Sequence, residues 1–468
     1  MTGSDPTLWT ATEQAAAIKD RRLGSEELLE LCLDRIDHVD PRVHAVCTLD
    51  LHRARIRAQA ADEATMRGES WGALHGLPIT IKDAIATEGI RSTGGAVELT
   101  DHVPAADAPV VARLRGAGAI VFGKTNLPRW SGDVQTYNEL FGTTNNPHDT
   151  SRVPGSSSGG AAAAVAMGFT SFEIGTDIGG SVRIPSHFCG VFGLKPSFGV
   201  VPQRGYLDRV GGGVTDADIN VFGPIARSAA DLELLMSVIA GPPPEDEIGW
   251  RIDLPQSTIT EPRGLRVGLW LDDPACAIDH EYRALLERTA TALADAGAAV
   301  VDEHPAVDFA EHNAMFLTMI TEAMRAAPDP AGGGRTHLEW LQIDDARALL
   351  RRRWAEWFAS FDVLLCPVTP TPPFAHHQSP NVFAETTTIN GRERPYIDHV
   401  GWTGLIGVLG LPSAVAPVGR TAGGLPVGVQ VVAPHLRDLD AVAVAGLIGT
   451  YHPPAAALAL NRGDRVPG

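Results

Sequence analysis

The sequence predicts an α/β fold in which one central mixed β-sheet is covered by α-helices on both faces. Short apolar runs alternate with helical patterns from residue 75 onward, as they do in layered α/β proteins. The 468 residues are 44% hydrophobic and 20% charged, which is ordinary globular composition. Because α/β folds often run long as one unit, a single domain over residues 1–468 is expected.

The first part of the chain, residues 10–66, is expected to be helical. At 24–29 a Gly-Ser cap precedes an amphipathic pattern, and Pro41 is expected to end that helix. Residues 75–240 then form the core of the fold. Its expected elements are a strand at 77–81, a helix at 110–114, a strand at 119–124 and a helix at 161–167.

The second half divides into a variable, mostly helical insert at 245–360 and the C-terminal part of the sheet at 361–455. Prolines and acids at 243–263 predict a surface connection before the insert. The expected elements are strands at 265–270, 298–301, 361–366 and 427–432, and helices at 282–294, at 303–360 and from 438.

Charge and cysteine content exclude several classes of function. A formal charge of −18 argues against a nucleic-acid partner, because phosphates would be repelled. The five cysteines lack C-x-x-C spacing, which argues against a disulfide framework or a zinc site. The first residues lack the pattern of a signal peptide, and no apolar run approaches the ~20 residues of a membrane span. A cytoplasmic protein without membrane contact, metal or cofactor is expected.

Two glycine- and serine-rich stretches carry the chemical signal. Residues 154–160 read Pro-Gly-Ser-Ser-Ser-Gly-Gly, and residues 175–183 read Gly-Thr-Asp-Ile-Gly-Gly-Ser-Val-Arg. Glycines before a serine let bare backbone N–H groups converge on one point, as an oxyanion hole requires. From composition alone, an alternative interpretation is that the two stretches are flexible turns without a catalytic role. A phosphate-binding loop is a second alternative, although the G-x-x-x-x-G-K-[ST] pattern is absent.

The segment 154–199 resembles the signature of the amidase signature family. The resemblance covers roughly residues 10–240 and 360–450, and implies that family's fold and hydrolysis of an amide through a serine. Further matching motifs lie at 76–83 (Gly-Leu-Pro-Ile-Thr-Ile-Lys-Asp), 123–127, 142–147, 189–196 and 223–228.

Carried over by position, the resemblance assigns three catalytic residues. Lys82 matches the family's lysine, Ser157 matches the serine that follows a cis peptide bond, and Ser181 matches the nucleophile. Asp177 and Arg183 flank the nucleophile and are expected to form a structural ion pair. The oxyanion would be held by the backbone N–H groups of Ile178, Gly179, Gly180 and Ser181.

These residue types suit the chemistry. A serine hydroxyl is a poor nucleophile until a base removes its proton. No histidine occupies the motif, so Lys82 must be that base, and an exposed lysine would be protonated at neutral pH. Lys82 follows an apolar run, and burial there would lower its pKa. A neutral Lys82 could accept a proton from Ser157, which would accept one from Ser181.

Within the family, the sequence favours a free-standing amidase. The glutamine-hydrolysing subunit of the tRNA-dependent amidotransferase, one alternative, commonly carries an Asp-Gln pair before its Gly-Pro, which 218–224 lacks. The second alternative is a catalytically silent binding protein with the same fold. Residues 185–189 and 201–205 resemble a bacterial subgroup with aryl and aliphatic acylamidases and some carbamate-cleaving enzymes.

Substrate choice is expected to depend on stretches that the resemblance does not match, namely 125–140, 200–220 and 310–400. Arg129 stands where many relatives carry an acid. The expected partner is a small-molecule amide, an aryl amide or carbamate among the options, and a homodimer is also considered. The aromatic candidates for the pocket are Trp130, Tyr137, Phe141, Tyr206, Phe316 and Trp402.

Overall fold

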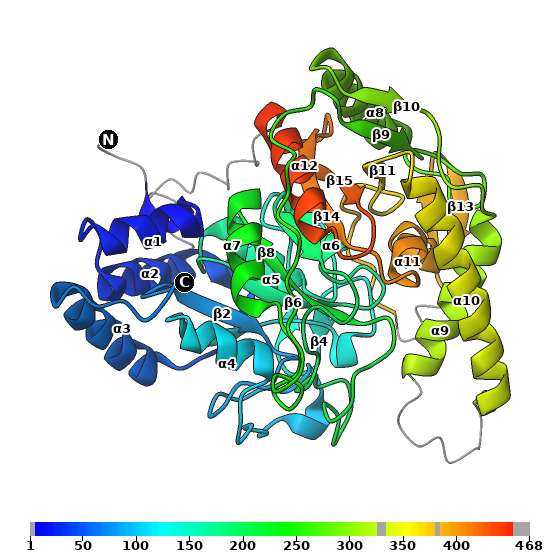
Figure 1. Cartoon of the computed structure of the whole chain (residues 1–468). Coiled ribbons are helices and arrows are strands. Elements are labelled where there is room, and N and C mark those ends of the chain that lie inside the picture. Colours follow the sequence, from blue (N-terminus) through cyan, green and yellow to red (C-terminus); the bar gives the residue numbers. More distant parts are fainter. Residues whose placement is uncertain (1–4, 325–333, 380–383, 453–468) are drawn as a thin grey trace.

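The computed structural model describes residues 5–324, 334–379 and 384–452 (Figure 1). Its centre is an eight-stranded mixed sheet. The pairs β10–β9 and β9–β11 are parallel, and the remaining neighbours in the sheet are antiparallel. The strand order is β10 (Ala299–Val301), β9 (Arg266–Leu269), β11 (Val363–Pro367), β15 (Pro426–Val432), β14 (Ser413–Arg420), β7 (Phe192–Lys195), β8 (Val221–Ala226) and β6 (Glu173–Asp177).

Helices cover both faces of this sheet, which confirms the α/β prediction (Figure 1). On one face α12 (Asp438–Tyr451) packs on β14 and contacts α7 (Ala229–Ile239) and α8 (His280–Asp295). On the other face α6 (Arg183–Cys189) packs on β15, β14 and β7, and α5 (Gly159–Met167) packs beside α6. Every residue of α5 is buried, which explains why seven of its nine residues are alanine or glycine.

A smaller three-stranded sheet lies beside the edge strand β6. Its order is β1 (Val46–Leu49), β3 (Ile120–Thr125) and β2 (Pro78–Lys82). β2 and β3 run parallel with α4 (Pro109–Gly116) between them in the chain, and β2 packs against β6. This arrangement brings the end of β2 next to the end of β6, where the glycine-rich loop begins.

The N-terminal part differs from the expectation in two respects. It holds α1 (Ala11–Lys19), α2 (Ser25–Val43) and α3 (Leu51–Met66), but β1 interrupts the helices. Pro41 does not end its helix, because α2 continues to Val43 and stops where His44 adopts a left-handed conformation. A proline so near the end of a helix removes one N–H and disturbs little that follows.

The remaining elements lie around the rim. The stretch 243–263 contains no helix or strand, as expected for a surface connection. None of the helices in the described ranges combines the length and apolarity of a membrane-spanning helix. The rim elements are α9 (Phe309–Met324), α10 (His337–Phe358), α11 (Gly401–Gly407), the hairpin of β12 (Thr386–Ile389) and β13 (Arg392–Pro395), and the short pair β4 (Tyr137–Asn138) and β5 (Gly142–Thr143).

The segment 154–196 lies at the centre of the fold. All of its residues except Ile178 are buried. It runs from the serine loop through α5, β6, the second glycine loop and α6 to the end of β7. The two stretches that carry the chemical signal are therefore enclosed by protein, apart from a short section of the second loop.

Candidate functional site

Lys82 ends β2 in the interior of the molecule, with no exposed surface. Its Nζ lies 2.6 Å from Ser157 Oγ and 2.7 Å from Thr176 Oγ1. Burial lowers the pKa of Lys82 to about 7, although the nearby carboxylates of Asp177 and Glu173 favour its charged form. The contact that the sequence predicts between Lys82 and Ser157 is thus present, in surroundings that allow a neutral amine near pH 7.

A buried carboxyl group fixes the backbone of Lys82. Glu173, at the start of β6, accepts hydrogen bonds from the Lys82 N–H at 3.1 Å and from Thr125 Oγ1 at 2.8 Å. Burial raises the pKa of Glu173 to about 7. Glu173 thus joins the ends of β2 and β3 to β6 at the point where the lysine side chain begins.

The serine loop and the second glycine loop meet through a backbone hydrogen bond. The Ser156–Ser157 peptide bond is cis, as expected, and the Ser158 N–H donates to the Ser181 carbonyl at 3.1 Å. Lys82 contacts Ser157 rather than either neighbouring serine. Ser181 Oγ, which was expected to pass its proton to Ser157, forms no direct hydrogen bond with it among the described residues.

The second loop presents several backbone donors. The N–H groups of Ile178, Gly179 and Ser181 have no acceptor among the described residues. The Gly180 N–H, which the resemblance adds to the oxyanion set, instead donates to Asp177 Oδ1 at 2.8 Å. Gly180 has φ +110°, and a Cβ there would lie 2.5 Å from Thr403 Oγ1, so only glycine fits.

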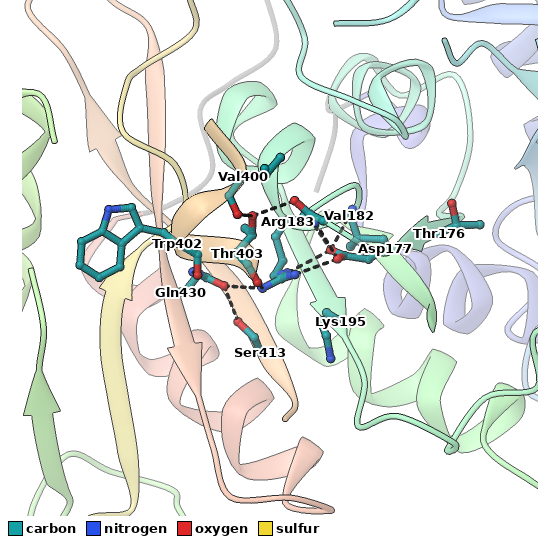
Figure 2. A network of polar contacts seen from close by, with 12 residues as sticks. Thr176, Asp177, Val182, Arg183, Lys195, Val400, Trp402, Thr403, Ser413 and Gln430 are labelled. Atoms are coloured by element: carbon teal, nitrogen blue, oxygen red, sulfur yellow. Dashed lines mark hydrogen bonds and ion pairs between the residues drawn. The ribbon is translucent and has the colours of Figure 1, made fainter. Parts of the chain in front are cut away.

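Asp177 and Arg183 form a fully buried, bidentate ion pair across this loop (Figure 2). Arg183 donates from Nη2 to Asp177 Oδ1 at 2.8 Å and from Nε to Oδ2 at 3.0 Å. Its Nη1 reaches Gln430 Oε1 at 2.8 Å and the Thr403 carbonyl at 2.9 Å. Burial alone would raise the pKa of Asp177, but Arg183 lowers it to about 2. The pair ties the loop to α11 and β15.

Ser181 opens onto a cavity of about 420 Å³. Ile178 and Gly179 also line it, so free N–H donors and the Ser181 side chain border the same space. Most of its lining is apolar. The other lining residues are Trp130, Ser131, Gly132, Asp133, Val134, Ser156, Tyr206, Asp208, Arg209, Ala217, Ile320, Thr321, Ala323, Met324, Tyr396, Ile397 and Val400.

The cavity tests the expected pocket residues. Apart from the signature residues Ser156, Ile178, Gly179 and Ser181, its walls come from the three unmatched stretches. Two of the six candidate aromatics, Trp130 and Tyr206, line it. Trp402 belongs instead to a buried aromatic group with Trp270 and Phe309. Phe316 is fully buried, whereas Tyr137 and Phe141 stand outside the lining.

The sequence predicted no particular role for several neighbours of the site. Thr176 precedes the motif's Asp177, and its contact with Lys82 depends on how β2 packs against β6. Tyr396 begins a short 3-10 helix, Tyr396–Val400, far along the chain. Arg129 pairs with Glu98 at the surface and does not line the cavity. Within the described ranges, no group of three acidic, histidine or cysteine side chains could hold a metal ion.

Comparison with known proteins agrees with this geometry. The family model described as Amidase matches residues 27–333 and 328–441. A glutamyl-tRNA(Gln) amidotransferase subunit from Synechococcus sp. (strain CC9605) is 31% identical, covering 92% of this chain and 93% of the relative. The crystal structure of a bacterial aryl acylamidase of the amidase signature family has 27% identity and a TM-score of 0.83, covering 95% of this chain and 96% of the other.

A second solved structure, described as an amidase, has 27% identity and a TM-score of 0.80, covering 95% of this chain and all of the other. The amidotransferase relatives and the solved amidases are about equally distant from this sequence. The family match spans most of the chain, and the lysine, the serines and the glycine-rich loop of its signature converge on one buried site. The chain therefore belongs to the amidase signature family and is a hydrolase acting on carbon–nitrogen bonds.

Proposed function

We propose that this protein is a free-standing amidase that hydrolyses a small carboxylic amide through an acyl-enzyme on Ser181, with aryl amides and carbamates among the candidates. The observation that carries the proposal is the buried contact of 2.6 Å between Lys82 Nζ and Ser157 Oγ, beside the cavity that Ser181 borders. Because the pKa of Lys82 is lowered to about 7, a substantial fraction of the amine is neutral at physiological pH.

In the proposed mechanism, substrate binding brings Ser181 Oγ within hydrogen-bond reach of Ser157, and neutral Lys82 then accepts the proton of Ser157 as Ser157 accepts that of Ser181. Ser181 Oγ then attacks the carbonyl carbon, and the free N–H groups of the second loop stabilise the oxyanion. The C–N bond breaks as the relay returns its proton to the leaving nitrogen. Water, deprotonated by the same relay, attacks the ester, and Ser181 leaves with a proton.

The second candidate is a glutamine-hydrolysing component of an amidotransferase. The names of several relatives favour it, since the curated proteins at about 30% identity are subunits of glutamyl-tRNA(Gln) amidotransferases. The largely apolar cavity favours a less polar substrate than glutamine. Ammonia release from glutamine, measured beside amine release from simple anilides, separates the two candidates.

Three single replacements test the mechanism. Ser181→Ala is expected to abolish turnover of anilides, because no other group can form the acyl-enzyme. Lys82→Ala should lose several orders of magnitude in kcat, and Ser157→Ala should be severe but leave more residual rate. The double variant of Lys82 and Ser157 should lose little more kcat than the worse single variant, because the two groups act as a unit.

A fluorophosphonate reagent, located by mass spectrometry, should label Ser181 in the unmodified protein. Labelling at Ser156 or Ser158, or full activity of Ser181→Ala, would contradict the assignment. A catalytically silent binding protein predicts no labelling at any of these serines and no release of coloured amine from any anilide of the panel.

A further inference from the structure

Two carboxylates on the wall of the cavity, Asp133 and Asp208, have a buried oxygen without a hydrogen-bond partner among the described residues, but only Asp208 is paired with a cation. Asp133 lines the cavity in the loop that follows Trp130. Its Oδ1 accepts hydrogen bonds from Tyr396 Oη at 2.9 Å and from the Val134 N–H at 2.6 Å. Its Oδ2 is buried and has no hydrogen-bond partner among the described residues. An unpaired carboxylate oxygen in the interior is costly unless a ligand supplies a donor.

The neighbours hold Asp133 in one orientation. Gln135 Nε2 donates to Tyr396 Oη at 3.2 Å. The tyrosine oxygen thus accepts from Gln135, while its own O–H donates to Asp133 Oδ1. The Tyr137 hydroxyl donates to the Ser379 carbonyl at 3.2 Å and also interacts with the Asp133 carboxyl group. Hydrogen bonds to Oδ1 therefore fix the side chain, while Oδ2 keeps its capacity to accept.

The charges that line the cavity also indicate that Asp133 lacks a partner. Its other charged lining residues are Asp208 and Arg209, and they pair with each other at 2.8 Å. Asp133 is left as the one lining charge without an opposite charge among the described residues. Burial raises the pKa of Asp133 above its ordinary value, the direction expected for a carboxylate that lacks a cation.

We propose that Asp133 is a specificity-determining residue that binds an ammonium group or another strong N–H donor on the substrate, whose remaining body is apolar. This inference rests on the proposed amidase function, because it names the kind of amide that the cavity accepts. The apolar walls, among them Trp130, Ile320 and Met324, would hold the hydrocarbon part. A charge-assisted hydrogen bond to Asp133 would then select amino-substituted amides over neutral ones.

The test uses binding to the Ser181→Ala protein, which does not depend on turnover. Calorimetry compares two isosteric pairs of amides in which an ammonium replaces a methyl group. The first pair is the 4-nitroanilide of 5-aminopentanoic acid against that of hexanoic acid. The second pair places the charge on the leaving amine, as the 4-(aminomethyl)anilide against the 4-ethylanilide of hexanoic acid.

In at least one pair, the ammonium ligand should bind about 10- to 100-fold more tightly than its isostere, the usual gain from a hydrogen bond to a charged group. Asp133→Asn, added to Ser181→Ala, should remove that preference and leave the neutral ligand's affinity nearly unchanged. Asp208→Asn is the matched control, since Asp208 lines the cavity but is paired with Arg209, and it should change both members of a pair alike.

The preference for the ammonium ligand can also be tested by changing pH, without replacing Asp133. In the Ser181→Ala protein it should disappear as acidic pH protonates the carboxylate, so misfolding of Asp133→Asn would not remove the test. Equal affinities within both pairs, no binding of any of the four ligands, or a preference that survives Asp133→Asn would overturn the proposal. Failure of the amidase function itself would appear separately, as absence of both amine release and fluorophosphonate labelling in the protein with Ser181 intact.

Discussion

Lys82 is held between two opposing influences. Complete burial disfavours its charged form, whereas the carboxylates of Asp177 and Glu173 favour it. Burial is the larger influence and brings the pKa from 10.5 to about 7. A lysine with more solvent would remain protonated at neutral pH and could not accept a proton from Ser157. The interior position of β2 therefore matters as much to the chemistry as the identity of the residue.

The pH dependence of turnover follows from this balance. Because the deprotonated amine is the base, kcat/KM should rise as pH increases through about 7 and remain high on the alkaline side. Glu173→Gln removes a negative charge that favours protonated Lys82, so its rising limb should move to lower pH. The measurement is the kcat/KM profile of an anilide between pH 5.5 and 9 in both proteins.

The amide oxygen of glutamine can still accept the Lys82 N–H, so the local backbone should persist in Glu173→Gln. Glu261→Gln, at an exposed position, is the control and should leave the profile unchanged. A profile that already falls above pH 7 without unfolding would argue against Lys82 as the base. A limb that moves to higher pH in Glu173→Gln would show that the carboxyl acts in some other way.

At the scale of elements, the loop between β6 and α6 depends on one buried ion pair. Asp177 accepts from the N–H groups of Gly180 and Val182 as well as from Arg183. Arg183 in turn reaches Gln430 on β15 and the Thr403 carbonyl in α11 (Figure 2). The loop that carries Ser181 is thus held from its own strand and from elements more than 200 residues away in sequence.

Removing one member of this pair should be costly. Arg183→Met leaves the Asp177 charge buried and unpaired, and should lower the free energy of unfolding by about 3–5 kcal/mol. The control is Arg266→Met, which breaks the more exposed pair with Asp362 and should cost about 1 kcal/mol or less. Urea unfolding followed by tryptophan fluorescence measures both values, and a similar small loss in the two variants would contradict the structural role of Arg183.

The sequence predicted those elements and site residues whose signal is local. Lys82, Ser157 and Ser181 lie in motifs of a few residues, and the apolar run before Lys82 indicated a buried strand that the structure contains. β1 was missed because none of its four residues is fully buried and the strand lies between helical patterns. Asp133 and Tyr396 could not be paired in advance, since 263 residues separate them and only the packed fold brings them into contact.

At the scale of the whole molecule, both ends of the described chain enter the same hydrophobic cluster. Ala11 in α1 and Ile448 in α12 belong to it, together with strands from the middle of the chain. The first turn of α1 also donates its Ala11 and Thr12 N–H groups to Asp231 at the start of α7. Neither end can separate without exposing part of this shared core.

We therefore expect one cooperative unfolding transition. Calorimetry should show a single peak, and far-UV circular dichroism and tryptophan fluorescence should report the same midpoint. Asp231→Asn, which weakens the attachment of α1, should shift that midpoint for both probes together. Two separated transitions, or a probe-dependent shift in Asp231→Asn, would show that the cluster does not couple the two halves.

The alanine-rich helix α5 has a consequence for how variation in this chain is interpreted. A Cβ at Gly160 would lie 2.5 Å from the backbone of Asn126, and all nine positions of α5 are buried. A saturation library should accept little beyond alanine, glycine and serine across most of this helix, although none of its residues borders the cavity. Intolerance there would reflect steric exclusion, so a selection for new substrates would gain more from diversifying the loops at 130–134 and 206–209.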